Sequence, residues 1–252
     1  MRSGAGSAAI WWLLSLSAML AIWLVAAAFS DPQVLPGPAR VAAVIASEAA
    51  TGELFRHVGV TLFRVVLAFV IAMAAGIGIG LVMGLSRTAD RFLDLWLVFF
   101  LNLPALVVII LAYVWLGLTE TAAVLAVAVN KIPNVVVTVR EGVRALDRDL
   151  DEVARVYRLS WQSRLVHLIV PQLAPYLAAA TRSGIALIWK IVLVVELLGR
   201  GDGVGFKLHL HFQLFEIDAI LAYALSFIAV MQLIEWLVLR PMERRANRWR
   251  QA

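Results

Sequence analysis

Long apolar runs, separated by short polar segments, extend along almost the whole chain. Most of these runs reach the roughly 20 residues that a helix needs to cross the hydrocarbon core of a bilayer. We therefore predict six membrane-spanning helices, over residues 8–29, 58–85, 92–117, 121–139, 172–198 and 219–239. The first run is too long for a signal peptide and has no clear cleavage site before Asp31, so we interpret it as a retained anchor.

The composition agrees with a single all-α, polytopic membrane domain over residues 1–252. Hydrophobic residues make up 62% of the chain, charged residues 15%, and the mean hydropathy is +0.88. These values exclude a soluble globular domain and an enzyme held by one anchor. The chain has no cysteine, which excludes disulfides and thiolate metal sites. We expect no nucleic-acid partner.

The distribution of basic residues predicts the orientation in the membrane. The loops on one side carry most of the arginines, namely Arg2, Arg87, Arg91, Arg140, Arg144, Arg148, Arg155, Arg158, Arg164, Arg240, Arg244, Arg245, Arg248 and Arg250. The opposite side carries only Arg40, Arg56, Arg200 and Lys207, with Arg64 close to the start of the second span. Because cytoplasmic loops accumulate Lys and Arg, we predict that the arginine-rich side and both termini are cytoplasmic.

Small residues and prolines mark special positions inside the spans. Gly76, Gly80 and Gly84 recur every four residues, so they share one helix face that lets another helix backbone approach closely. Pro104 is predicted to bend the third span near Asn102, and Pro133 to interrupt the fourth span beside Asn130 and Lys131. Broken helices with adjacent polar groups often line a translocation path, although a kink that serves only packing explains them equally well.

Charged residues inside the predicted spans need partners or a wet cavity, because each costs about 2.5 to 3.5 kcal/mol on insertion scales. These residues are Arg64, Lys131, Arg182, Lys190, Glu196 and Glu235. Lys190 lies near mid-span, where it either pairs with a carboxylate such as Glu235 or with a backbone carbonyl at a kink, or attracts an anionic substrate. Arg182 and Glu196 are about 21 Å apart along a helix, so each needs its own partner. Our candidate residues for the translocation path are Asn102, Pro104, Asn130, Arg182, Trp189, Lys190 and Glu196.

The longest polar segment, residues 140–171, has the features of two short helices. Asp149, Asp151 and Glu152 open the first helix, which ends near Arg158, so acids lie at its N-terminus and bases at its C-terminus. Ser160 is the predicted N-cap of the second helix, which carries Trp161, Leu165 and Leu168 on one face and ends at Pro171. We expect the two helices to lie at right angles under the membrane.

This segment resembles the EAA loop of bacterial ABC importer permeases. The matching positions are Glu152, Ala154, Ser160, Trp161, Ile169, Pro171 and Pro175. The chain departs from the pattern at Val153, where the family has alanine, and at Arg158, where it has glycine. That glycine permits a tight turn between the two short helices, so Arg158 implies an altered turn or a strained backbone.

Other motifs are similar to the nitrate, sulfonate, taurine and bicarbonate branch of this family. The matches are Pro104, Leu111, Trp115, Gly117 and Glu120, then Arg182, Trp189 and Glu196 in the fifth span, the segment 203–206 and the segment 240–245. Ile110 stands where the branch usually has a second proline, and Lys190 where it generally has an uncharged residue.

The resemblance implies a type I ABC importer permease fold in a bacterial inner membrane. It implies two permease copies, here a homodimer, two cytoplasmic ATP-binding subunits, a periplasmic substrate-binding protein and contact with membrane lipid. The loop 140–171 would dock the ATPase through Asp151, Glu152, Ala154, Arg155, Tyr157, Arg158, Leu159, Ser160 and Trp161. Because the chain has no phosphate-binding loop, ATP and Mg would be bound by the partner, and we expect no cofactor or enzymatic activity in this chain. The expected substrate is a small anion such as a sulfonate, taurine or nitrate.

Several alternatives remain open at this point. A gradient-driven transporter or channel would also explain the intramembrane charges, and related permeases carry thiamine-precursor heterocycles. A membrane-embedded enzyme is disfavoured, since the spans lack a dense cluster of His or Asp. His209 and His211 resemble a zinc pair, but their alternation with Leu210 and Phe212 favours a short amphipathic external segment that contacts the binding protein.

Overall fold

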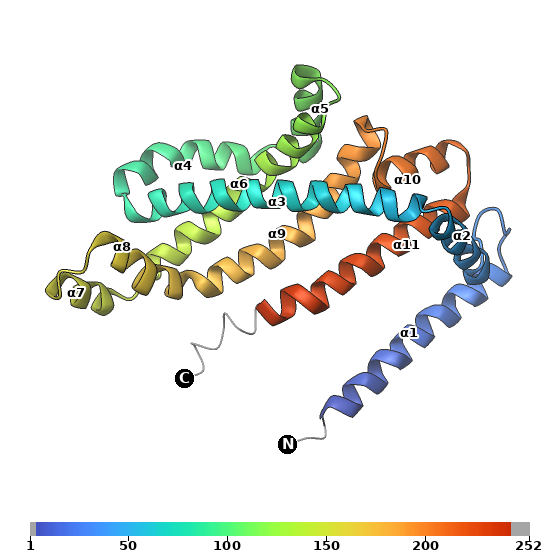
Figure 1. Cartoon of the computed structure of the whole chain (residues 1–252), viewed down its shortest axis with the longest axis horizontal. Coiled ribbons are helices and arrows are strands. Elements are labelled where there is room, and N and C mark those ends of the chain that lie inside the picture. The colour runs from blue at the N-terminus through green and yellow to red at the C-terminus, as the bar shows by residue number, and fades with distance from the viewer. Residues whose placement is uncertain (1–3, 243–252) are drawn as a thin grey trace.

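The structure, a computed structural model, describes residues 4–242, and it has no strand in that range. Its helices are α1 (Gly4–Ala28), α2 (Pro38–Ala50), α3 (Glu53–Leu85), α4 (Arg87–Asn102), α5 (Ala105–Leu116), α6 (Glu120–Arg144), α7 (Arg148–Val156), α8 (Trp161–Arg164), α9 (Val170–Gly199), α10 (Val204–Gln213) and α11 (Ile217–Ile234), with π-helical turns η1 (Leu165–Ile169) and η2 (Glu235–Leu239) (Figure 1). Five helical segments are long and apolar enough to cross a membrane, or six if α4 and α5 form one bent span. The predicted all-α membrane fold is confirmed. Arg2 and the arginines beyond residue 242 lie outside the described residues.

The three helices α3, α6 and α9 form the centre of the protein. Most of the side chains in the window of α6 that is apolar enough to span a membrane are buried, whereas the corresponding window of α1 has no buried residue. A Cβ atom built on Gly76, Gly80 or Gly84 of α3 would lie 2.5 to 2.7 Å from the Cβ of Val135, Val139 or Val143 of α6. The glycine face therefore lets the backbone of α3 pack directly against the valine side chains of α6. The packing interpretation of these glycines is confirmed.

The two prolines of the middle spans behave differently. At Pro104 the chain turns by 95° between α4 and α5, so the bend predicted near Asn102 is confirmed. Pro133 instead lies buried within the unbroken helix α6, so the predicted interruption there is wrong. A proline removes one backbone hydrogen bond, and the close packing of α6 against its neighbours keeps the helix together despite that loss.

The helix that contains the fifth span begins earlier than predicted. Residues Trp161–Gly199 form one continuous helical segment of 39 residues, made of α8, η1 and α9. The prediction that a separate surface helix ends at Pro171 is therefore wrong. The π-helical turn η1 lies directly before Pro171, and it widens the helix where the proline ring would clash with the preceding turn.

The N-terminal helix α1 stands apart from the central helices (Figure 1). Its large apolar side chains are exposed, as expected for a helix surrounded by lipid. The ring of Trp12 lies 5.1 Å from that of Trp236 in η2, so α1 and the last span meet near the chain ends. Two further helices, α2 and α10, were not predicted. In α10, His209 and His211 lie in a helix and not in the expected alternating segment.

Candidate functional site

The segment between α6 and α9 forms the predicted coupling loop, and its tight turn has a specific hydrogen bond. Helix α7 ends at Val156, and the backbone N–H of Leu159 donates to the carbonyl oxygen of Ala154 at 2.9 Å. This six-to-one bond defines a Schellman motif, whose C′ residue adopts the left-handed conformation. Here that residue is Arg158, with φ of 49°. The turn is the one that glycine would favour, with an arginine in its left-handed position. Of the two predicted alternatives, an altered turn and a strained backbone, the structure has the second.

The exposed surface of this loop consists of large apolar side chains and one carboxylate. Val156 and Tyr157 are 79% and 76% exposed, Leu159 and Trp161 are also exposed, and Glu152 lies on the same surface. We name Glu152, Val156, Tyr157, Leu159 and Trp161 the coupling surface. Contiguous large apolar side chains on a surface mark a site of contact with another protein or with the membrane.

The other residues predicted to contact an ATPase are arranged differently. Ala154 is 2% exposed, so its methyl group packs inside the protein. The Ser160 hydroxyl accepts from the N–H of Ser163 at 3.2 Å, which confirms the predicted N-cap of α8. Asp151 and Arg155 belong to the helix α7, but their side chains lie outside what the structure describes.

Two of the predicted path residues of α9, Arg182 and Trp189, line one hollow of about 440 Å³ together with Glu235, whereas Lys190 and Glu196 do not line it. Arg182 pairs with Glu235 of η2 at 2.9 Å, whereas Glu196 is buried near the opposite end of α9. Lys190 is exposed, and its ammonium nitrogen lies 5.6 Å from the centroid of the Trp189 ring. No carboxylate among the described side chains pairs with Lys190. Glu235 pairs with Arg182 instead, so the Lys190–Glu235 pair that the sequence allowed is not formed.

The predicted path residues of the middle spans lie on α4, α5 and α6. The side-chain amide of Asn102 donates to the carbonyl oxygen of Val98 at 2.7 Å, at the exposed bend before Pro104. Asn130 is half-buried in α6. Its neighbour Lys131 is buried next to Gly184 of α9, and no described carboxylate pairs with it. The bend and the half-buried amide remain candidates for the path.

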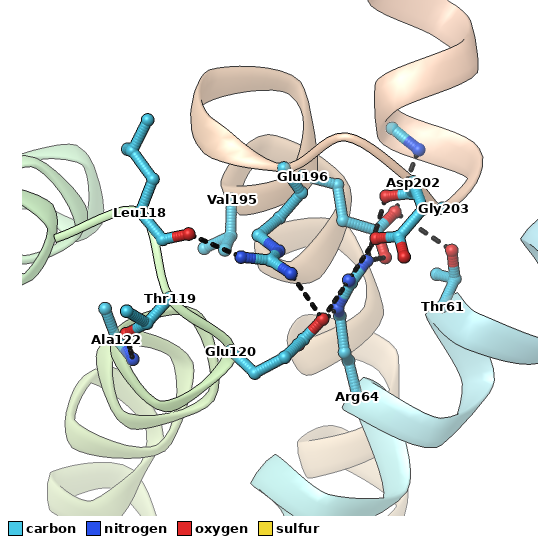
Figure 2. A network of polar contacts seen from close by, with 12 residues as sticks. Thr61, Arg64, Leu118, Thr119, Glu120, Ala122, Val195, Glu196, Asp202 and Gly203 are labelled. Carbon is cyan, nitrogen blue, oxygen red and sulfur yellow. Dashed lines mark hydrogen bonds and ion pairs between the residues drawn. The ribbon is translucent and has the colours of Figure 1, made fainter.

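A buried charge network joins α3, α6 and α9 (Figure 2). It includes Glu120 at the start of α6, whereas the coupling loop follows the end of that helix. Its centre is Arg64 of α3, whose side chain is almost fully buried. The guanidinium donates from Nη1 to Glu196 Oε1 at 2.7 Å, from Nε to Glu120 Oε2 at 2.9 Å, and from Nη2 to Asp202 Oδ1. We name Arg64, Glu120, Glu196, Asp202 and Arg200 the Arg64 network.

Further donors complete the Arg64 network. Arg200 donates to Glu120 Oε1 and to the carbonyl oxygen of Leu118, both at 2.6 Å. Glu196 Oε2 accepts from the Thr61 hydroxyl and from the N–H of Gly205, both at 2.9 Å. A buried carboxylate with three donors is satisfied, and removal of any one partner is costly.

Gly203 and Gly205, which follow Asp202 of the Arg64 network in the sequence, lie too close to neighbouring atoms to carry a side chain. A Cβ on Gly205 would lie 2.2 Å from the carbonyl oxygen of Leu193, and Gly203 has φ of 100°. The N–H of Gly203 donates to His57 Nδ1 at 2.9 Å, and that of Val204 donates to Thr61 Oγ1 at 2.8 Å. The turn into α10 is thereby fixed against α3 and α9.

The sequence reasoning identified Glu196 but missed its partners. Arg64 was recognised as a charge in a span, and Glu120 as part of a family motif, yet no pattern joins them or adds Asp202. The available signal was that Arg64, Glu120 and Glu196 all lie toward the same predicted side of the membrane. The histidines of α10 contribute no metal site within residues 4–242: His211 Nδ1 contacts Glu216 Oε2 at 2.7 Å, and no group of three ligand residues converges there.

Known permeases are similar to this chain over most of its length. It is 29% identical over 240 residues to a Bacillus subtilis (strain 168) protein named as the aliphatic sulfonates transport permease SsuC, with 94% of this chain and 87% of the relative covered. It is 26% identical over 242 residues to the taurine transport system permease protein TauC of Escherichia coli (strain K12), with 93% and 88% covered.

The fold is also similar to that of a solved ABC transporter. A chain of the MetNI methionine ABC transporter, solved in inward facing conformations, matches with a TM-score of 0.69 at 15% identity, covering 80% of this chain and 99% of that chain. This likeness concerns the fold alone. The family of binding-protein-dependent transport system inner membrane components matches residues 76–241, well over half of the chain, so this protein belongs to that family of ABC importer permeases.

Proposed function

We propose that this permease forms the path for a small anionic solute, such as a sulfonate, taurine, nitrate or a related organic acid. Four relatives support this substrate class through their names, which specify aliphatic sulfonates, taurine, nitrate and bicarbonate. The proposal also rests on Lys190, an exposed cation that lies nine residues before the end of α9 and has no carboxylate partner among the described side chains. A cation that lines a path inside a membrane lowers the cost of moving an anion across it.

The proposed assembly is a homodimer with two cytoplasmic ATP-binding subunits and a periplasmic substrate-binding protein. The observation that carries the ATPase contact is the exposed coupling surface. The helical segment Trp161–Gly199 is about 58 Å long, nearly twice the thickness of the hydrocarbon core, so its beginning extends beyond the membrane. The coupling surface would therefore be available to a soluble subunit.

In this mechanism the partner binds ATP and Mg, and this chain transmits the resulting movement. Closure of the ATPase pair would displace the coupling surface, and the continuous segment from Trp161 to Gly199 would carry that displacement into the membrane as a rigid body. Lys190 and Trp189 lie on that segment, so these two candidate path residues would move with the coupling loop. ATP hydrolysis would then reset the path.

A charge reversal at Glu152 tests the ATPase contact. In the complex reconstituted with its ATPase and binding protein, Glu152→Arg should abolish substrate-stimulated ATP hydrolysis, because the reversed charge opposes docking of the partner. Asp149→Arg is the matched control, since Asp149 is an exposed acid of the same helix outside the coupling surface. Stimulated hydrolysis that survives Glu152→Arg would disprove the contact, and transport without any ATPase would favour a gradient-driven transporter.

A neutral substitution at Lys190 tests the substrate class separately. Lys190→Met keeps a long side chain and removes the charge, so uptake of taurine or an alkanesulfonate should fall about tenfold, as for the loss of one charge contact of about 1.4 kcal/mol. Substrate-free ATP hydrolysis should stay unchanged. Undiminished anion uptake at normal protein levels would rule out the role of Lys190, and uptake of a neutral heterocycle by the wild type would rule out the substrate class.

A further inference from the structure

A groove on the surface of α3, α4 and α6 has no role in the transport mechanism above. After the turn at Ser86, α4 runs back along α3 (Figure 1). The groove between these helices and α6 has a volume of about 300 Å³. Buried Met83, Leu97 and Val136 form its floor, and the exposed side chains of Ile79, Trp96 and Phe100 form its rim. The groove is therefore apolar along its whole length.

At the end where α4 begins, the groove continues into a second hollow of about 380 Å³ with a different character. Met83 lines both spaces, and the second is also lined by Arg87, Asp90, Arg91 and Arg144. Asp90 already accepts from Arg144 at 2.5 Å. Arg87 and Arg91 are exposed, and neither pairs with any side chain that the structure describes. Two cations at this end of the groove therefore have no paired carboxylate among the described side chains.

The dimensions of the two hollows correspond to one leaflet of a bilayer. Helix α3 is a candidate span that ends at Leu85, so Arg87 follows directly where the chain leaves the membrane. From Arg91 to Phe100 the helix rises about 14 Å, roughly half of the 30 Å hydrocarbon core. The arginines would lie at the depth of lipid phosphates and the apolar groove at the depth of acyl chains.

We propose that this groove is a binding site for an anionic glycerophospholipid. One acyl chain would lie on Met83, Leu97 and Phe100, and the phosphate would contact Arg87 and Arg91. An apolar groove alone accepts the acyl chain of any lipid, whereas basic residues at its mouth select an anionic head group. The bound lipid would connect α4 to α3 and α6 where the helix-to-helix contact leaves space.

Quenching of Trp96 fluorescence by lipids with brominated acyl chains tests the site. The full-length protein would be reconstituted in phosphatidylcholine bilayers that contain a small fraction of brominated phosphatidylglycerol or, separately, brominated phosphatidylcholine. The signal of Trp96 is the difference between the wild type and Trp96→Phe. Brominated phosphatidylglycerol should quench this signal more strongly than brominated phosphatidylcholine does at the same fraction.

The double variant Arg87→Gln/Arg91→Gln should remove this preference. Its affinity for phosphatidylglycerol should fall about 30-fold, since each basic residue near an anionic head group contributes about 1 kcal/mol. Arg56→Gln is the matched control, because Arg56 is an exposed arginine at the other end of α3. Equal quenching by both lipids would overturn the proposal in favour of general solvation by lipid. Absence of quenching by either lipid would also overturn the proposal. It would indicate that a second copy of the chain covers the groove.

Discussion

The Arg64 network and the coupling surface lie at opposite ends of the same helices and are built in opposite ways. In the Arg64 network, one buried guanidinium contacts carboxylates of α6, of α9 and of the loop before α10. At the coupling surface, large apolar side chains are exposed, and the turn contains Arg158 in a conformation that favours glycine. One end is held by ion pairs within the chain, and the other exposes large apolar side chains.

This difference shows which end of the helices is free to be displaced. Breaking a buried ion pair leaves an uncompensated charge in a medium of low dielectric constant, so α3, α6 and α9 stay together at the Arg64 network. The coupling loop contacts α9 through neutral groups, such as the hydrogen bond from the N–H of Asp147 to Gln172 Oε1 at 2.9 Å. Movement imposed at the coupling surface would therefore pivot about the Arg64 network.

Removing the central cation should have the largest effect. Arg64→Met leaves Glu196 buried without its guanidinium, so we expect the free energy of unfolding in mixed micelles to fall by about 3 to 5 kcal/mol. Arg40→Met is the control, since the Arg40 side chain, which pairs with Asp218, is 55% exposed and the pair should contribute less than about 1 kcal/mol. Equal losses for the two variants would show that the network does not hold this end, and partial recovery in Arg64→Met/Glu196→Gln would support it.

Removing one neutral partner of the network should have an intermediate effect. Thr61→Val deletes the hydroxyl that accepts from the N–H of Val204, so the free energy of unfolding should fall by about 1 to 3 kcal/mol. Hydrogen exchange at the Val204 amide should accelerate as well. Thr138→Val removes only an exposed contact to the carbonyl oxygen of Asn134 and should change stability by about 0.5 kcal/mol or less. Unchanged exchange at Val204 in Thr61→Val would contradict the assignment.

The smallest effect should appear at the coupling surface, with the opposite sign. Arg158→Gly removes the steric cost of the left-handed conformation, so the turn should become more stable by about 1 kcal/mol. Slower hydrogen exchange at the Leu159 amide would measure this gain. Tyr157→Gly is the control at the neighbouring position, where φ is not positive and glycine should destabilise the turn. If both variants weakened the turn equally, Arg158 would not be strained.

Local patterns predicted those features that depend on neighbouring residues along the chain. The spacing of the glycines in α3 indicated a packing face, Pro104 indicated a bend, and Ser160 indicated an N-cap. The family resemblance was also predicted from short motifs and is confirmed. These predictions succeeded because helix periodicity, backbone sterics and capping act within one or two turns.

Pro133 and Pro171 show where local rules fail. Each was expected to end or interrupt a helix, and each lies inside a continuous helical segment. The packing of α6 between its neighbours compensates at Pro133, and the π-helical turn η1 compensates at Pro171. Neither compensation is visible in the residues that surround the proline in the sequence.

The sequence by itself determined that the chain crosses the membrane several times, because hydrophobic length is a property of contiguous residues. It also determined the family. Only the tertiary structure decided that Arg64 meets Glu120, Glu196 and Asp202, that Lys190 does not pair with Glu235, and that Arg87 and Arg91 lie at the mouth of an apolar groove. Electrostatic partners inside a membrane depend on which helices lie side by side and in which rotation, and packing between segments far apart in the chain sets both.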